Sequence, residues 1–185
     1  MFIGHVCVGG KDLEFEEIKY TGPSSFIGGI KLVHTDGYIA CGTYGRGSKW
    51  GCKRHESSIG MIITDNKRRV IYPSPRLIRL KPGGWYTLPG YTSSSQELVL
   101  VDFAHPKYLM RNETLQIWYG EDLYDYTELN NRGFTCMDVY AYPMAFDVIP
   151  QCPVTTCATP KKSAIMSPQN STNKRTPKVN DTGEF

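Results

Sequence analysis

Apolar and polar residues alternate along several stretches of the chain, a pattern typical of β-strands with one face in a core. In residues 115–119, Leu115, Ile117 and Tyr119 share the core face, whereas Gln116 and Trp118 point outward or toward a second packed layer. The alternation as a whole predicts strands at residues 15–20, 30–33, 59–64, 98–103, 115–119 and 137–142.

Turn-forming residues separate these stretches. Gly, Pro, Asp and Asn gather at residues 21–23, 65–66, 81–84 and 89–90, a spacing typical of the short connections of antiparallel sheets. Neither a βαβ rhythm nor a long stripe of helical period is present. The predicted fold class is therefore all-β, as an antiparallel β-sandwich or jelly roll.

The composition changes near Ile149. Residues 150–185 are dominated by Pro, Ser, Thr, Asn and Lys, and such a segment cannot bury enough apolar surface to offset its ordering entropy. We predict one β-sandwich domain at residues 1–149, followed by a disordered C-terminal tail at residues 150–185.

Composition and charge narrow the class of protein. The chain has 12 Tyr, 7 Phe and 18 Gly among 185 residues and a net charge of +3, which fits a sheet protein and gives no reason to expect nucleic acid as a partner. No apolar run approaches the roughly 20 residues of a membrane-spanning helix. Residues 1–10 lack the features of a secretory signal. We therefore expect no membrane span and a fragment that lacks its natural start.

Cysteine usage indicates an oxidising compartment, and six cysteines are compatible with three disulfides. Two of them flank the Gly-rich loop of residues 42–51, so we predict a disulfide between Cys41 and Cys52 with Cα atoms within about 7 Å of each other. Cys152 and Cys157 either pair with one another or tether the tail to the domain. If they pair with one another, the remaining pair is Cys7 and Cys136, although sequence alone does not choose among the fifteen connectivities.

Glycosylation sequons favour the same compartment. They occur at Asn112, Asn170 and Asn180. Such triplets are glycan acceptors on exposed segments of secreted chains. We therefore expect a secreted or extracellular glycoprotein.

The loop between Cys41 and Cys52 carries the first candidate ligand site. Tyr44, Arg46 and Trp50, with Lys49, place aromatic rings and hydrogen-bond donors on a restrained loop that we expect to face solvent. Aromatic rings that stack on sugars, next to groups that hold hydroxyls, suit glycan recognition and suit protein contacts equally. Two alternatives stand beside this one: Trp50 caps the core, or Cys41, Cys52 and His55 bind zinc. The zinc alternative lacks a C-x-x-C pair and a fourth ligand.

A second candidate site follows the strand at residues 115–119. Glu121, Asp122 and Asp125 lie in the acidic segment 120–133, beside Trp118. Their oxygens could ligate calcium, but the spacing does not match a D-x-D-x-D-G loop. A solvated acidic loop is favoured over a calcium site.

Neither the basic residues nor the histidines indicate a specific binding or catalytic site. The basic stretch of residues 67–69, with Arg76, Arg79 and Lys81, could meet an anion, although charged turns are ordinary on globular domains. The four histidines fall in unrelated contexts, and no catalytic motif accompanies them. The sequence therefore predicts a protein that is not an enzyme and needs no cofactor or metal.

Several segments together resemble a known type of module: residues 29–34, 50–52, 70–73, 96–99, 117–123 and 136–141. They are similar to an uncharacterised cysteine-containing module of predicted secreted proteins of simple marine animals, over about residues 19–142. The resemblance implies an extracellular context and no particular chemistry. It leaves Cys7 and the tail unexplained.

These observations together favour a non-catalytic extracellular binding module, with a glycan as the leading ligand class and an extracellular protein as the other partner. One alternative is a structural or adhesive matrix module with the tail as a glycosylated spacer. The other is a hydrolase whose site has no recognised motif, such as a cysteine that meets a distant histidine in the fold.

Overall fold

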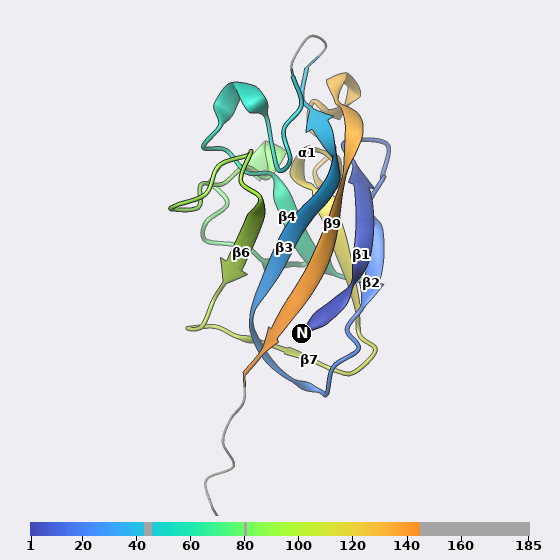
Figure 1. The fold of residues 1–185 in the computed structure, drawn as a ribbon, viewed down its shortest axis with the longest axis vertical. Coiled ribbons are helices and arrows are strands. Elements are labelled where there is room, and N and C mark those ends of the chain that lie inside the picture. Colours follow the sequence, from blue (N-terminus) through green and yellow to red (C-terminus); the bar gives the residue numbers. More distant parts are fainter. Residues whose placement is uncertain (43–45, 80, 145–185) are drawn as a thin grey trace, which may run out of the picture. The chain divides into compact units, whose positions relative to one another are not determined.

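Two antiparallel sheets form the protein in the computed structural model, which describes residues 1–42, 46–79 and 81–144 (Figure 1). The five-stranded sheet has the order β1 (Phe2–Gly9), β9 (Arg132–Pro143), β3 (Ser25–Ala40) and β6 (Glu97–Val101), and β7 (Lys107–Leu109) also pairs with β3. The four-stranded sheet has the order β2 (Glu16–Lys19), β8 (Thr114–Tyr119), β4 (Met61–Asp65) and β5 (Val70–Tyr72). The predicted all-β antiparallel sandwich is confirmed, whereas the predicted tail lies outside the described residues.

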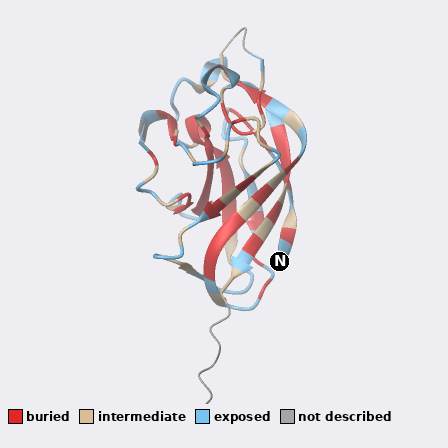
Figure 2. Cartoon of the chain, turned by 60° about the vertical axis from the view of Figure 1, so that its left-hand side comes forward, coloured by how far each residue is buried: buried red, intermediate tan, exposed pale blue. Residues whose placement is uncertain are grey.

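One hydrophobic core joins the facing surfaces of the two sheets. The five-stranded sheet contributes Leu32 and Val139, and the four-stranded sheet contributes Ile63 and Ile117, all fully buried. Alternation places every second side chain of a strand on this inner face. Figure 2 shows the result as stripes of buried and less buried residues along the five-stranded sheet.

Strand β1 was not predicted because its alternation is interrupted. Its inward side chains are Ile3, Val6 and Val8, and the step of three residues between the first two breaks the period of two. The register against β9 shifts between Phe2 and Gly4, which is the effect of a β-bulge that adds one residue to a strand. A pattern search for strict alternation therefore misses this strand.

Strand β3 is 16 residues long, although only residues 30–33 were predicted. Its register against β9 shifts between Ile27 and Gly29 and again between His34 and Asp36. Each shift exchanges the faces to which successive side chains point. The alternating pattern is therefore continuous only between the two bulges.

The outer face of the four-stranded sheet is covered by a second layer. Trp118 is fully buried there, with the ring of Phe15 stacked on it at 4.0 Å and the guanidinium of Arg68 at 5.0 Å from its ring centre. Gln116, on the same face, is only 6% exposed. Of the two orientations expected for Trp118 and Gln116, the one toward a packed layer is correct and the exposed one is wrong.

Gln116 links this layer through hydrogen bonds. Its Oε1 accepts from Thr64 Oγ1 and Trp118 Nε1, both at 3.3 Å, and its Nε2 donates to Glu17 Oε1 at 3.0 Å. Gln116→Ala is therefore expected to destabilise the fold by about 1 kcal/mol, the usual net loss when a buried hydrogen-bonding side chain is removed. Urea unfolding of the variant checks this value, and a change near zero would mean that the network contributes nothing to stability.

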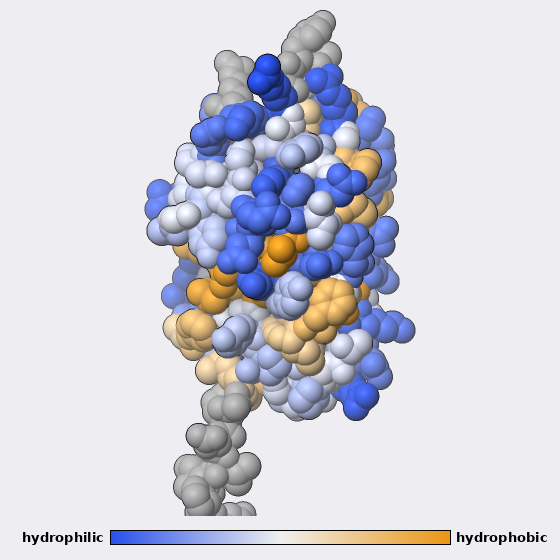
Figure 3. Space-filling model, in the orientation of Figure 1, coloured by the Kyte–Doolittle hydropathy of each residue, from blue (hydrophilic) through white to orange (hydrophobic). Residues whose placement is uncertain are grey.

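The outer face of the five-stranded sheet, in contrast, exposes apolar side chains. Phe2, Val101 and Tyr142 are 52%, 42% and 68% exposed. Figure 3 shows apolar residues gathered over the lower part of this face, among hydrophilic ones. Tyr142 is therefore an aromatic side chain whose removal should leave the core intact.

Short helical turns connect the strands and carry much of the candidate site. They are η1 (Lys53–His55), η2 (Lys81–Gly83), α1 (Gly120–Leu123) and η3 (Glu128–Asn130). The helix α1 follows β8 directly, and the Gly120 N–H donates to the Gly60 carbonyl at 2.7 Å. The acidic segment that follows β8 is thereby attached to the end of the four-stranded sheet.

Candidate functional site

A cavity of 430 Å³ lies where the Cys41–Cys52 loop meets the acidic segment after β8. We call it the loop cavity. Two aromatic side chains, one carboxylate and several smaller polar groups line it. Its lining residues are Cys41, Gly42, Cys52, His55, Ser58, Trp85, Glu121, Tyr126, Thr127 and Asn130. The two segments that the sequence marked separately therefore contribute to one concave surface.

A disulfide joins Cys41 to Cys52, with their Cα atoms 5.4 Å apart. This confirms the pairing and the distance predicted from the sequence. Because both sulfurs are joined to each other, they do not serve as the thiolate ligands that the zinc alternative requires. The loop is further held where the Ile39 N–H donates to the Ser48 carbonyl at 3.0 Å and the Ser48 N–H donates back at 2.9 Å.

Trp50 belongs to the core rather than to the surface. Its side chain is fully buried, its Nε1 donates to the Ser95 carbonyl at 2.6 Å, and its ring meets His34 edge-on at 5.7 Å. The expectation that Trp50 faces solvent is wrong, and the alternative that it caps the core describes its environment. An indole without solvent access offers no face for a sugar to stack on.

Trp85 supplies an aromatic wall of the loop cavity. It is half-buried and meets Tyr119 edge-on, with ring centres 5.6 Å apart. The backbone of the next residue, Tyr86, is fixed by paired hydrogen bonds with Ile59 of 2.8 and 3.0 Å. A side chain at Gly83 would collide with the indole nitrogen of Trp85, so glycine at this position allows the ring to lie against η2.

Glu121 places a carboxylate in the lining of the loop cavity, although its side chain is only 6% exposed. Asn131 Nδ2 donates to its Oε2 at 2.8 Å, and Thr127 Oγ1 donates to its Oε1 at 3.4 Å. Burial raises the pKa of Glu121, while the hydrogen bonds from Asn131, Thr127 and Trp85 act in the opposite direction. The carboxylate is thus held in one orientation by its neighbours.

Two further carboxyl groups, those of Asp122 and Glu128, follow Glu121 in the same segment. Asp122 is 1% exposed, and its Oδ1 accepts the Leu13 N–H at 2.8 Å. Its Oδ2 and the Oε2 of Glu128 have no hydrogen-bond donor among the described residues. Burial, followed by the interaction with Asp122 and the charges of Asp125 and Asp12, raises the pKa of Glu128 to about 7. Protonation of Glu128 relieves its repulsion with the nearby acidic side chains.

The favoured interpretation of the segment as a solvated acidic loop is therefore only partly correct. Asp125 is exposed, but Glu121 and Asp122 are buried. Both lie in α1, which packs against the end of the four-stranded sheet. Their burial follows from the tertiary position of α1, because two adjacent acidic residues in sequence are otherwise typical of a surface.

The other predicted site residues do not line the loop cavity. Arg46 is exposed, Trp118 is buried in the layer over the four-stranded sheet, and Tyr44 lies outside the described residues. The sequence search missed Trp85, Tyr126 and the contribution of Asn130. The signal that was available for Trp85 is the Gly83-Gly84 pair before it, which permits a tight approach of the ring.

The basic stretch contributes to the fold. Arg69 Nε donates to Asp65 Oδ2 at 2.6 Å, and Arg68 lies over the ring of Trp118. The Asp65 carboxylate also accepts the backbone N–H groups of Lys67 and Arg69, at 2.8 and 2.9 Å. Two of the three adjacent cations therefore stabilise the turn between β4 and β5 and the layer beside it.

The structure describes only some of the residues that the sequence marked for disulfides and glycosylation. The second disulfide within the described residues joins Cys7 to Cys136. Asn112 is exposed in a turn, with φ of 68°. Cys152, Cys157, Asn170 and Asn180 lie outside the described residues. Within the described ranges, no helix is long and apolar enough to cross a membrane.

Comparison with known proteins gives one similarity of fold and sequence. No family model matches the chain, and no curated protein matches it. Among solved structures, AJLec from the sea anemone Anthopleura japonica superposes with a TM-score of 0.67 at 28% sequence identity, over 78% of this chain and 98% of that chain. This similarity is consistent with the resemblance to a cysteine-containing module of marine animals. The chain is thus similar, over nearly the whole length of AJLec, to a sea anemone protein.

Proposed function

We propose that this chain is a non-catalytic, extracellular glycan-binding module and that the loop cavity is its binding site. The observation that carries the proposal is the joint lining of this cavity by the rings of Trp85 and Tyr126 and by the polar groups of Glu121, Thr127 and Asn130. Aromatic rings stack on the apolar faces of sugars, and carboxylate, amide and hydroxyl groups hold sugar hydroxyls.

The similarity to AJLec supports a glycan as the ligand class. The name of that protein is that of a lectin, and the matched region covers 98% of it. The two disulfides of the described residues, Cys7–Cys136 and Cys41–Cys52, support an extracellular setting because such bonds persist in oxidising compartments.

The carboxylate arrangement favours binding over hydrolysis. Most glycoside hydrolases place two carboxyl groups on either side of the bond that they cleave. Among the described residues that line the loop cavity, Glu121 is the single carboxylate, and it already accepts hydrogen bonds from Asn131 and Thr127. These contacts suit a fixed acceptor of sugar hydroxyls better than a group that exchanges protons with a substrate.

A glycan array followed by titration calorimetry tests the proposal. The array identifies a bound glycan, and calorimetry then compares wild type with Tyr126→Ala and Asn130→Ala, both at exposed positions of the cavity. We expect each variant to lose about tenfold in affinity, because one stacking or hydrogen-bonding contact is typically worth about 1–1.5 kcal/mol. Thermal melts should stay within about 2 °C of wild type, since exposed substitutions change stability little.

Tyr142→Ala is the matched control. Tyr142 is 68% exposed on β9 and does not line the loop cavity. Its removal should leave the affinity unchanged. The absence of any bound glycan would contradict the function, and equal affinities of Tyr126→Ala and Tyr142→Ala would contradict the location of the site.

A further inference from the structure

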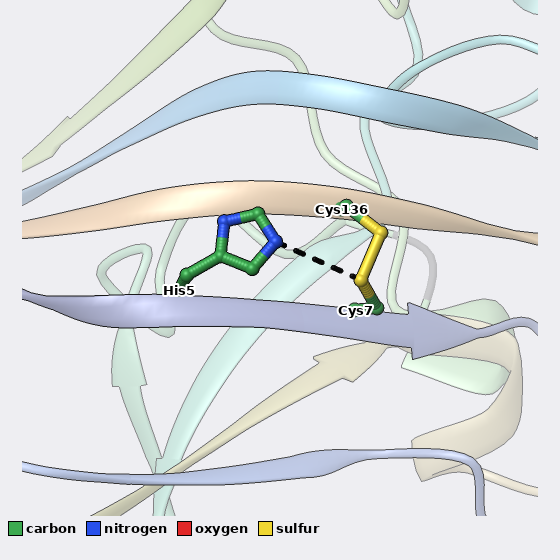
Figure 4. A group of neighbouring side chains, drawn as sticks. All are labelled: His5, Cys7 and Cys136. Atoms are coloured by element: carbon green, nitrogen blue, oxygen red, sulfur yellow. Dashed lines mark hydrogen bonds between the residues drawn. A yellow bond between two sulfur atoms is a disulfide. The ribbon is translucent and has the colours of Figure 1, made fainter.

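A second cluster of reactive side chains lies on the outer face of the five-stranded sheet, away from the residues that line the loop cavity. The imidazole of His5 and the sulfurs of Cys7 and Cys136 lie within 4.8 Å of one another. Cys7 on β1 is directly opposite Cys136 on β9, with Cα atoms 3.9 Å apart, and the two sulfurs form a disulfide. Figure 4 shows the imidazole beside this bond.

Strand pairing explains why the histidine lies there. His5 is opposite Asp138 in the same ladder, two positions away from the cysteine pair. Residues two apart on a strand point to the same face, so the two pairs are neighbours on one surface. A histidine–carboxylate pair therefore lies next to the disulfide.

Asp138 orients the imidazole toward the sulfurs. His5 Nδ1 lies 2.9 Å from Asp138 Oδ1. On the other side of the ring, His5 Nε2 lies 3.9 Å from Cys7 Sγ, the contact that Figure 4 marks with a dashed line. When the ring is protonated, its Nδ1–H donates to the carboxylate and its Nε2–H faces the disulfide. A carboxylate on one ring nitrogen is the usual means of fixing which face of a histidine performs chemistry.

Solvent reaches this disulfide from one side. Cys7 is exposed, whereas Cys136 is only 5% exposed. Cys7 also lines a separate cavity of 490 Å³, together with Lys11, Glu14 and Phe15. A small thiol can therefore approach a sulfur of this bond through the open cavity.

From this arrangement we infer that Cys7–Cys136 is a site of thiol–disulfide exchange with low-molecular-weight thiols, with His5 as the proton donor to the departing sulfur. The thiolate of the small molecule attacks one sulfur and forms a mixed disulfide, while the bond between Cys7 and Cys136 breaks. The other cysteine leaves as a thiolate and takes the proton from the His5 imidazolium. Because the imidazole lies within 4.8 Å of both sulfurs, it can serve either leaving group.

A second small thiol completes the reaction. It attacks the mixed disulfide, releases the remaining cysteine and forms the oxidised small-molecule disulfide, and the protons of the two thiols end on the two cysteines. Two electrons pass from the small thiols to the protein. A cation beside a thiolate stabilises it and speeds its departure, so His5 and its partner Asp138 should make this bond the more reducible of the two described.

Cys41–Cys52 provides an internal reference in the same molecule. Among the described residues, no other histidine lies with two cysteine sulfurs inside the 4.8 Å that separates the atoms of the His5 cluster. The reducibility of Cys41–Cys52 should therefore not depend on any residue of that cluster. A change that alters only the Cys7–Cys136 rate reports chemistry at the cluster and not general opening of the fold.

The experiment measures the rate at which glutathione reduces each disulfide of the whole chain. Samples are quenched with an alkylating reagent over time, and peptide mass spectrometry follows Cys7–Cys136 and Cys41–Cys52 separately. His5→Gln, which keeps a polar side chain but cannot act as an acid, should slow reduction of Cys7–Cys136 by about tenfold. Asp138→Asn should slow it by a smaller factor, and Asp138→Glu should restore most of the wild-type rate.

His105→Gln is the matched control variant. His105 is exposed and its Nδ1 lies 3.2 Å from Asp102 Oδ1, a pairing like that of His5, but within the described part of the chain it forms no cluster with a cysteine. It should leave both reduction rates unchanged. Equal Cys7–Cys136 rates in wild type and His5→Gln, or an equal slowing of both disulfides, would overturn the inference.

Discussion

Replacing Trp118 with alanine is expected to destabilise the fold by about 3–5 kcal/mol, the range for removal of a large aromatic side chain from a packed interior. The side chain is fully buried between Phe15 and Arg68. Its Nε1 also donates to Thr64 Oγ1 at 3.2 Å. The variant loses apolar burial, an aromatic stack and a hydrogen bond in one step.

Urea unfolding measures this loss, with Tyr142→Ala as the surface control. Tyr142 is an aromatic residue of similar size on the exposed face of the other sheet, so its removal should change stability by no more than about 0.5 kcal/mol. A loss below about 1 kcal/mol for Trp118→Ala would show that the layer of Phe15 and Arg68 does not pack on the sheet as described. The result also separates a structural tryptophan from the ligand-binding role predicted for it from sequence.

Stability is expected to fall as pH rises from about 5 to about 8, because the carboxyl group of Glu128 is more easily protonated in the folded state than in the unfolded state. Its pKa is raised from 4.5 to about 7 by burial and by the nearby carboxyl group of Asp122. A carboxyl group of this kind contributes fully below its unfolded pKa and loses its contribution as pH rises through its folded pKa. Glu121 acts in the same direction, since burial raises its pKa as well.

Two carboxyl groups with lowered pKa values, Asp65 and Asp102, affect stability in the opposite direction, but only below about pH 5. Burial of Asp65 and Asp102 opposes their ionisation, but hydrogen bonds from Arg69, and from Ser74 and His105, outweigh it and lower both pKa values. Such groups stabilise the fold above their unfolded pKa of 3.8 and lose this contribution only at lower pH. They should not mask the decline between about pH 5 and about pH 8.

Glu128→Gln isolates the effect. The amide cannot ionise, and its NH₂ group can donate to Asp122 Oδ2, which has no donor among the described residues. The variant should be more stable than wild type at about pH 8 by about 1–2 kcal/mol, less than the full pKa shift implies because Glu128 is partly exposed and water screens the repulsion. At about pH 5 the two proteins should be nearly equal.

Thermal melts across this range, with a chelator present to remove divalent cations, test the prediction. Glu113→Gln is the control, because Glu113 lies in the turn before β8 and its Oε2 accepts the exposed Met110 N–H at 2.8 Å. If wild type and Glu128→Gln show the same dependence on pH, ionisation of Glu128 is not the cause of the decline in stability.

The proposed glycan site and the inferred exchange site use different parts of the same sandwich. The loop cavity is built from connections between strands, namely the Cys41–Cys52 loop, the segment before Tyr86 and the segment after β8. The exchange site is built on two paired strands, β1 and β9. Rigid strands hold His5 and the disulfide in register, whereas the loops set the shape of the cavity.

The sequence by itself determined the fold class, because alternation and turn residues are local signals that strands require. It also predicted the Cys41–Cys52 pair, since a disulfide stabilises a short exposed Gly-rich loop by closing it. Residues 30–33, 98–103, 115–119 and 137–142 lie within or overlap observed strands for the same reason. Strand β1 was not predicted from the sequence, because a bulge breaks its period of two.

Only the tertiary structure decided which side chains are available at the surface. The sequence pattern assigned Trp50 to a solvent-facing loop and left the side chain of Trp118 either exposed or in a second layer, yet both are fully buried. Their burial depends on Ser95 and Phe15, which lie 45 and 103 positions away and which no local pattern connects to them. The lining of the loop cavity was likewise decided by the tertiary structure, because Trp85 lines it together with residues of the Cys41–Cys52 loop and of the acidic segment after β8. Periodicity reports which face a residue occupies, but the layer that covers that face is set by contacts between distant parts of the chain.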